Sequence, residues 1–324
     1  MTIGTELEWT LLGLLMEFVI GGTAASVAVF FTNPLEVIKT RFQLQGELRA
    51  KGHYPVYYRN VLHAFYIIAK TDGIAALQGG LAPALAYQIV LNGTRLGLFQ
   101  VAEERKWLKD PQGQTSLLKS IGFSTLAGGF GGFISSPFYL IKVHSQARAN
   151  ESIAVGYQHE HRGLLNALGN IYKEFGLKGL FRGATAGIIR ISIASVTQLP
   201  TFTLCKEYLR AHQVFSTTGS GFVDSFVSAM VGGVVVAIFM TPFDVVSTRF
   251  YNQGVDATGK GITYKNLLDC MMKCFRKEGM SGLYKGFVPC YFRIGPYNLL
   301  TLVCWDGLKT LQKQYIPSTR LKST

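Results

Sequence analysis

The chain has 324 residues, of which 48% are hydrophobic and only 16% are charged. Soluble domains carry about 25% charged residues, so the composition argues against a soluble enzyme, and no His, Cys or carboxylate cluster has catalytic spacing. The formal net charge is +13, but the basic residues lie between apolar runs and form no nucleic-acid-binding motif. Anionic lipid headgroups and an anionic solute explain this excess better than nucleic acid does.

The N-terminal segment carries Glu6 and Glu8 where a signal or transit peptide needs basic residues. Any organelle address is therefore expected to lie within the mature chain. The five cysteines form no CxxC pair and no zinc spacing with histidine. We accordingly expect reduced thiols and no metal site.

Long apolar, glycine-rich stretches recur along the chain, each near the roughly 20 residues with which a helix crosses a bilayer. The sequence predicts an all-α membrane protein whose six membrane-spanning helices cover residues 10–44, 80–108, 117–148, 184–211, 221–252 and 287–314. Short amphipathic helices are expected along the membrane surface near residues 60–70, 163–174 and 266–277.

A proline motif closes the first, third and fifth apolar runs, as PLEVIKTR from Pro34, PFYLIKVH from Pro137 and PFDVVSTR from Pro242. A glycine-started motif and a second apolar run follow each one. The pattern predicts three tandem two-helix repeats, over residues 1–110, 111–213 and 214–324. Because proline removes a backbone hydrogen bond and kinks a helix, three prolines at one depth predict a symmetric constriction around a central pathway.

The glycine-started motifs run from Asp72-Gly73 to Gly79, from Gly176 to Phe181-Arg182-Gly183, and from Glu278-Gly279 to Tyr284-Lys285-Gly286. Together with the proline motifs they resemble the mitochondrial carrier family, solute carrier family 25, over essentially the whole chain. The resemblance implies a monomeric, pseudo-threefold six-helix bundle in the mitochondrial inner membrane. It also implies an antiporter, with no enzymatic activity, that alternates between cytosol-open and matrix-open states.

Bound cardiolipin is the lipid partner that the resemblance implies, and no other cofactor is expected. Helix N-termini that begin at glycine offer free backbone N–H groups to anions. The residues expected at the lipid sites are Gly73, Gly176, Arg182, Gly183, Gly279, Lys285 and Gly286. Repeat one departs from this pattern, because Leu77-Gln78 stands in place of the aromatic-basic pair.

The resemblance also implies a matrix gate of ion pairs between the proline motifs. Glu36 is expected to pair with Lys142, and Asp244 with Lys39. Tyr139 and Ser247 occupy the acidic and basic positions of the third pair, so only a neutral hydrogen bond, worth about 1 kcal/mol, is available there. Gln43 and Gln146 stand where the family places glutamines that brace the pairs, and Tyr251 replaces the third.

The cytosolic gate of the family uses an acidic and a basic residue on each even-numbered helix. The corresponding positions here are Gln100, Glu103, Thr203, Lys206, Asp306 and Lys309. Only the last pair matches the pattern fully, and we expect an ion pair between Asp306 and Lys206.

Family members bind solute near the bilayer midplane, about 20 Å below this gate at about 1.5 Å rise per residue. That places Tyr87, Arg190 and Arg293 at the substrate site, with Gln88 and Arg95 nearby. No acidic residue lies beside the two arginines in their own helices, so we expect an unneutralised cationic site. Guanidinium groups match carboxylate or sulfate oxygens bidentately.

The predicted substrate is a small dianion, namely a dicarboxylate such as oxaloacetate, malate or malonate, or a sulfur oxoanion such as sulfate or thiosulfate. The alternative is a carrier-fold protein that conducts protons or fatty-acid anions, or that serves as a scaffold, which the incomplete gates would allow. Two intramembrane arginines count against the alternative because such charges are costly and usually functional.

Overall fold

The computed structural model describes residues 3–49, 52–110, 116–211 and 221–315, and the regular elements of these ranges are helices. The long helices are α1 (Ile3–Leu44), α3 (Leu81–Glu104), α7 (Ala184–Ala211), α8 (Gly221–Asn252) and α10 (Phe287–Tyr315), together with a broken helix whose two parts are α4 (Leu117–Ile134) and α5 (Ser136–Ala147). The short helices are α2 (Val61–Thr71), α6 (Leu164–Leu180) and α9 (Leu267–Leu283), with single 3₁₀ turns at η1 (Ile74–Gln78) and η2 (Glu151–Ile153).

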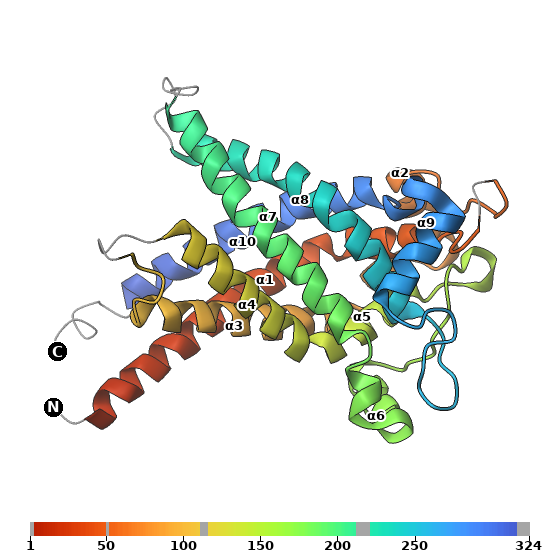
Figure 1. Cartoon of the computed structure of the whole chain (residues 1–324), viewed down its shortest axis with the longest axis horizontal. Coiled ribbons are helices and arrows are strands. Elements are labelled where there is room, and N and C mark those ends of the chain that lie inside the picture. Colours follow the sequence, from red (N-terminus) through yellow and green to blue (C-terminus); the bar gives the residue numbers. More distant parts are fainter. Residues whose placement is uncertain (1–2, 50–51, 111–115, 212–220, 316–324) are drawn as a thin grey trace.

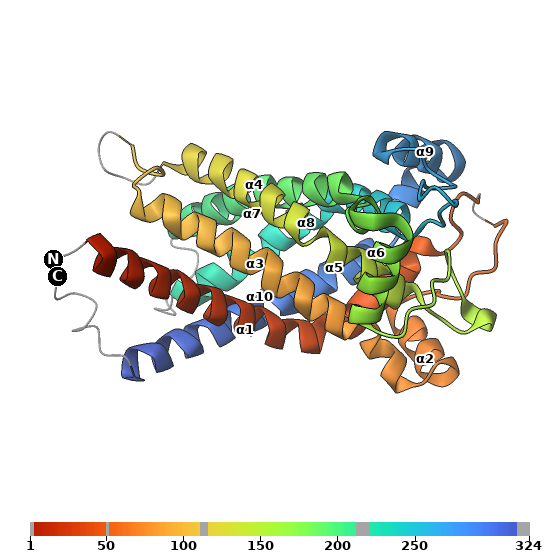
Figure 2. The same cartoon turned by 90° about the horizontal axis from the view of Figure 1, so that it is seen from below.

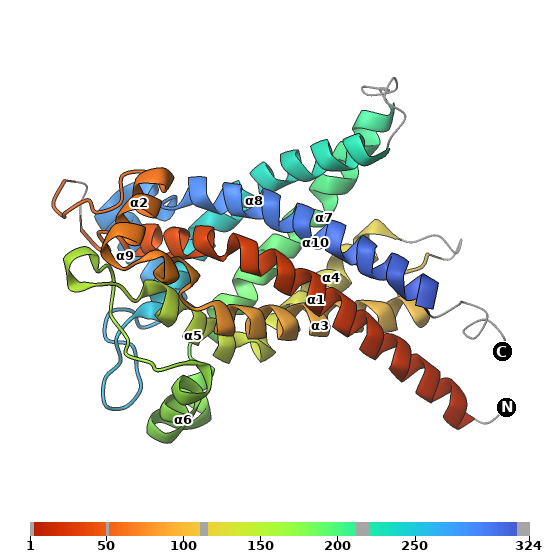
Figure 3. The ribbon, with the colours of Figure 1, turned by 180° about the vertical axis from the view of Figure 1, so that it is seen from behind.

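The long helices form a closed ring in chain order. In the described residues α1 packs on α3, α3 on α4, α4 on α7, α7 on α8, α8 on α10, and α10 on α1. Figures 1 and 2 show α2, α6 and α9 gathered at one end of this bundle, called here the surface-helix end. The long helices spread apart toward the opposite end, where α1 begins and α10 ends (Figure 3).

Four helical stretches of the described chain are long and apolar enough to cross a membrane, namely Ile74–Glu103, Leu117–Ile134, Ala184–Leu209 and Met230–Asn252. Their outward-facing side chains include Leu126, Phe130 and Phe239, each more than half exposed in the isolated chain. Apolar side chains on the outside of a bundle suit a hydrocarbon solvent rather than water. The all-α membrane fold expected from the sequence is thus what the chain forms.

The three prolines do not act alike. Pro34 and Pro242 lie inside the continuous helices α1 and α8, whereas Pro137 follows a break at Ser135 that separates α4 from α5. In repeat one, the carbonyl of Phe30, which Pro34 leaves without its helical donor, accepts a hydrogen bond from Gln78 Nε2 at 3.1 Å. The three kinks are therefore not equivalent, because the helix is broken just before Pro137 and is continuous through Pro34 and Pro242.

A glycine with positive φ marks the same point in each repeat. The φ angles are +70° at Gly80, +87° at Gly183 and +81° at Gly286, so the repeat-one counterpart is Gly80 rather than Gly79. A Cβ on any of them would come within 3.1 Å of a side chain of the next repeat, on Gln146, Tyr251 or Gln43 respectively. These three contacts join neighbouring repeats at the surface-helix end, and each such boundary is called here a seam between repeats.

Substituting Gly183 with alanine is expected to lower the free energy of unfolding by about 2–4 kcal/mol. The alanine would have to adopt a left-handed conformation, and its Cβ would lie 2.8 Å from a carbon of the Tyr251 ring. Gly169→Ala in α6 is the matched control, because nothing lies within 4 Å of its added Cβ, and it should stabilise by about 0.5–1 kcal/mol. Thermal unfolding of the purified variants measures the difference, and equal melting temperatures would contradict the assignment.

Candidate functional site

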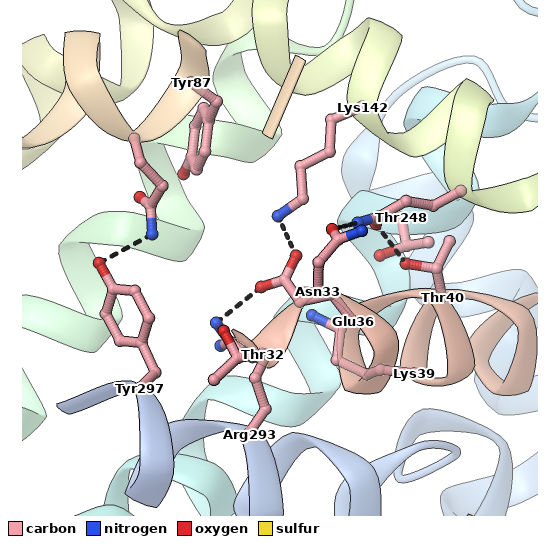
Figure 4. A network of polar contacts seen from close by, with 12 residues as sticks. Thr32, Asn33, Glu36, Lys39, Thr40, Tyr87, Lys142, Thr248, Arg293 and Tyr297 are labelled. Atoms are coloured by element: carbon pink, nitrogen blue, oxygen red, sulfur yellow. Dashed lines mark hydrogen bonds and ion pairs between the residues drawn. The ribbon is translucent and has the colours of Figure 1, made fainter. Parts of the chain in front are cut away.

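Two buried ion pairs cross between repeats near the surface-helix end. Lys39 Nζ lies 2.6 Å from Asp244 Oδ2 and joins α1 to α8. Lys142 pairs with Glu36 and joins α5 to α1 (Figure 4). All four side chains are at most 11% exposed, and removing one member of a buried pair costs about 3–5 kcal/mol. These are the two pairs that the sequence predicted for the gate.

The third position contains no ion pair, and the expected hydrogen bond between Tyr139 and Ser247 is wrong. The Ser247 hydroxyl instead donates to the carbonyl of Ala186 at 3.2 Å, because a backbone acceptor of α7 lies within its reach. The Tyr139 ring packs between the rings of Tyr87 and Tyr251, with centroids 5.1 and 5.0 Å away. It also lies under the guanidinium of Arg190, 4.4 Å from the guanidinium carbon.

Because these are ring contacts, Tyr139→Phe is expected to keep stability within about 1 kcal/mol of the wild type, whereas Tyr139→Ala should lose about 3–5 kcal/mol. The phenylalanine keeps the ring and the cation–π geometry and removes only a hydroxyl. Thermal unfolding of the two variants side by side measures how much of the stabilisation comes from the aromatic ring of Tyr139. A phenylalanine variant as unstable as the alanine variant would show that the hydroxyl carries the role.

The two glutamines brace different partners. Gln43 Nε2 donates to Asp244 Oδ2 at 2.8 Å and so supports the Lys39–Asp244 pair. Gln146 does not contact the other pair, contrary to expectation. It accepts from Thr40 at 3.0 Å and donates to Asn33 Oδ1 at 3.1 Å (Figure 4), since both lie on α1, across the seam from α5.

The two predicted substrate arginines converge on the gate carboxylates. Arg293 Nη1 lies 2.8 Å from Glu36 Oε1, and Arg190 Nη1 lies 3.8 Å from Asp244 Oδ1. Arg190 Nη2 also donates to the Tyr87 hydroxyl at 2.6 Å. The expectation of an unneutralised pair was wrong for this conformation, because the carboxylates belong to α1 and α8 rather than to the helices of the arginines.

The combined cluster is still electropositive. Each carboxylate serves one lysine and one arginine, so four cations meet two anions and two positive charges are left unbalanced. The Nε atoms of Arg190 and Arg293 are buried and have no hydrogen-bond partner among the described residues. A buried donor without a partner costs about 1–3 kcal/mol, which a bound anion would recover.

A polar bridge that the sequence analysis did not predict closes one side of this cluster. Gln88 Nε2 donates to the Tyr297 hydroxyl at 2.8 Å (Figure 4), and Asn92 Nδ2 approaches the same hydroxyl at 3.4 Å. Tyr297 lies one helical turn after Arg293, and that spacing on one helix face could have suggested it. Arg95, farther along α3, makes no hydrogen bond or ion pair with the described side chains.

The structure describes the side chains of three of the six predicted cytosolic-gate residues. The side chains of Gln100, Lys206 and Asp306 lie outside the described residues, so the Asp306–Lys206 pair stays a prediction. Within the described part, Glu103 is exposed, and Lys309 Nζ lies 5.5 Å from the centroid of the Trp305 ring.

The glycines expected at lipid sites have the backbone that the prediction requires. Gly73, Gly176 and Gly279 have φ of +86°, +64° and +68°, and nothing lies within 4 Å of a Cβ on any of them. Lys285, however, points inward. Its Nζ lies 2.5 Å from Glu278 Oε2 and donates to the carbonyl of Gln45 at 3.0 Å. Lipid contact at these positions stays a prediction that rests on the glycines.

The helix ring, the three-fold seams and the gate pairs define a carrier bundle. The family model described as mitochondrial carrier protein matches residues 12–109, 113–213 and 219–315. The chain therefore belongs to the mitochondrial carrier family, which confirms the family and the fold class predicted from the sequence. It is a transporter of the mitochondrial inner membrane rather than an enzyme.

Several relatives match the chain over nearly their whole length. The chain is 47% identical to solute carrier family 25 member 35 of Mus musculus, over 93% of this chain and 99% of that protein. It is 38% identical to the mitochondrial oxaloacetate transport protein of Saccharomyces cerevisiae, over 94% and 91%. It is 36% identical to the mitochondrial citrate transporter E of Aspergillus niger, over 88% and 89%.

Proposed function

We propose that this carrier exchanges small dianions across the inner membrane by alternating access, with dicarboxylates such as oxaloacetate, malate or malonate as the first candidates and sulfate or thiosulfate as further ones. The observation that supports it is the cluster of Lys39, Lys142, Arg190 and Arg293 with Glu36 and Asp244. Two of its positive charges are unbalanced, and two buried guanidinium Nε atoms have no partner among the described residues. A dianion supplies the missing charge and the missing acceptors together.

The same cluster also links substrate binding to the opening of the matrix gate. Arg293 and Arg190 hold the same carboxylates that close the gate. A substrate that takes over these guanidinium groups would leave each carboxylate with one cation, its lysine. Gate opening would then cost less with substrate bound than without it, which couples exchange to occupancy.

Two of the relatives support an organic anion in particular. One is an oxaloacetate transport protein and another a citrate transporter. A tricarboxylate would exceed the two unbalanced charges and would need Arg95 as a further partner, so the charge count favours a dicarboxylate.

Uptake of labelled anions into proteoliposomes preloaded with unlabelled anions tests the proposal. We expect labelled malate or oxaloacetate to enter only when a dianion is inside, and citrate to enter more slowly. Protein-free vesicles are the control. Exchange of citrate alone, or of no dianion, would contradict the proposal. Proton flux in the absence of any dianion would instead favour the proton-conducting alternative.

A further inference from the structure

Three histidines meet at the seam between repeats two and three. His144 lies near the end of α5, and His159 and His161 lie in the loop that follows it. One ring nitrogen from each lies within 4.8 Å of those of the other two. None of them belongs to the substrate cluster or to the gate pairs, so the carrier cycle proposed above leaves them without a role.

The other two repeats show what usually stands at this position. Arg41 and Arg249 occupy the place of His144 in their proline motifs, and each forms a buried ion pair, with Asp72 at 2.7 Å and with Glu278 at 2.5 Å. Repeat two has Phe175 where the acidic residue would stand. An arginine–carboxylate pair has thus been replaced by a group of imidazoles.

His144 retains one part of the arginine's role. Arg41 Nε and Arg249 Nε donate to backbone carbonyls of the next repeat, on Gln146 at 3.4 Å and Gln43 at 2.9 Å. His144 Nε2 makes the corresponding contact, 2.9 Å from the carbonyl of Tyr251. The seam is therefore kept, and the remaining nitrogen of the ring, Nδ1, faces His161 Nε2 at 3.1 Å instead of a carboxylate.

The hydrogen bonds leave lone pairs inside the group. His144 Nε2 and His159 Nε2 face the carbonyls of Tyr251 and Asn252, at 2.9 and 3.0 Å. A carbonyl only accepts, so both rings carry their proton on Nε2 and have an unprotonated Nδ1. His161 Nε2 therefore donates to His144 Nδ1 at 3.1 Å in the metal-free protein, and His161 Nδ1 is buried without a partner among the described residues. An ion bound between the two rings would displace that proton to His161 Nδ1. A carbonyl that fixes the remote N–H is the usual support of a metal-bound histidine.

The spacing suits one small metal ion. Two nitrogens bound to one zinc ion at about 2.0–2.1 Å are about 3.3 Å apart in a tetrahedral site, close to the 3.1 Å between His144 and His161. The His159 ring is stacked on that of His144 with centroids 3.5 Å apart. The two rings must separate for His159 Nδ1 to reach the same ion, and this movement would release the contact between His159 Nε2 and the carbonyl of Asn252.

Space and charge around the rings allow the remaining ligands. The three histidines line a cavity of about 280 Å³ together with Glu174, Asp256 and Arg182. Two carboxylates outnumber the one guanidinium, and the volume holds several waters besides the ion. Imidazole is a preferred ligand of zinc and of neighbouring transition metals.

We propose that His144, His159 and His161 form a binding site for one divalent transition-metal ion, with Zn²⁺ the best match. The bound ion would link the loop after α5 to the surface-helix end of the seam between repeats two and three. The site reverses the sequence-based expectation of no metal. Sequence spacing could not reveal it, because the contribution of His144 depends on a cross-repeat contact.

Zinc binding to the full-length, tag-free, chelator-treated protein tests the proposal, by competition with a chromophoric chelator and by thermal unfolding. We expect one Zn²⁺ per chain and, at a hundredfold excess over the dissociation constant, a melting temperature raised by about 5 °C. His159→Gln and His161→Gln should lose both effects. His53→Gln, at an exposed site outside the group, should keep them.

His161→Cys is the rescue variant, because a thiolate also binds zinc. It should bind Zn²⁺ where His161→Gln does not, which separates a ligand role from a merely structural one. Each variant is first compared with the wild type in metal-free unfolding to show that it is folded. No zinc binding by the wild type, or equal binding by the wild type and both glutamine variants, would overturn the proposal.

Discussion

Replacing Arg190 with alanine is expected to lower the rate of dianion exchange by about 100-fold while the protein remains folded. Arg190 offers a guanidinium whose Nη2 holds Tyr87 at 2.6 Å and whose Nε has no partner among the described residues. Two charge-assisted hydrogen bonds to substrate, each worth about 1.5–3 kcal/mol, would be lost, and about 1.4 kcal/mol corresponds to a factor of ten in rate. Asp244 keeps Lys39 and Gln43 as partners, so the fold is expected to persist.

Matched variants separate the charge of Arg190 from its shape. Arg190→Lys keeps the charge but loses the planar fork, so its exchange rate should fall between those of wild type and Arg190→Ala. Arg293→Ala should resemble Arg190→Ala, since Arg293 contributes the second guanidinium. Arg276→Ala, on the exposed face of α9, should exchange normally. Wild-type rates in Arg190→Ala and Arg293→Ala would move the substrate site elsewhere.

The positions of these groups could be predicted from the sequence because they follow from the repeats. The proline motifs fix the depth of Glu36, Lys39, Lys142 and Asp244, and the expected helices near 184–211 and 221–252 match α7 and α8. A glycine with positive φ recurs at the corresponding position of each repeat, at Gly80, Gly183 and Gly286. A motif that repeats three times gives each residue a depth and a face, and ion pairs between neighbouring repeats follow from those two coordinates.

The partners of the arginines could not be predicted in the same way. Arg293 and Glu36 are far apart in sequence, and their contact depends on how closely α10 approaches α1 in this conformation. Tyr297 carries no motif and acquires its role from Gln88 on another helix. The partner of Ser247 could not be predicted either, because its hydroxyl donates to the backbone carbonyl of Ala186, and every residue offers such a carbonyl. Contacts of this kind are set by helix packing rather than by residue type.

Glu36→Gln is expected to shift the carrier away from the matrix-closed state by a factor of about 100–1,000. Glu36 is shared by Lys142 and Arg293, so its neutralisation leaves both cations without their carboxylate. Breaking a buried pair costs about 3–5 kcal/mol. Only the Lys39–Asp244 pair would then hold the gate, because Tyr139 and Ser247 contribute no third one.

Thiol labelling from the matrix face measures this shift. Ser247 is fully buried in the closed seam, so Ser247→Cys in a chain without its native cysteines reports on gate opening. A membrane-impermeant reagent should label that cysteine much faster when Glu36→Gln is also present. Glu151→Gln, an exposed carboxylate of η2, is the matched control and should leave labelling unchanged. If Glu36→Gln also left it unchanged, the gate would not depend on the shared carboxylate, and the coupling of substrate binding to opening would lose its basis.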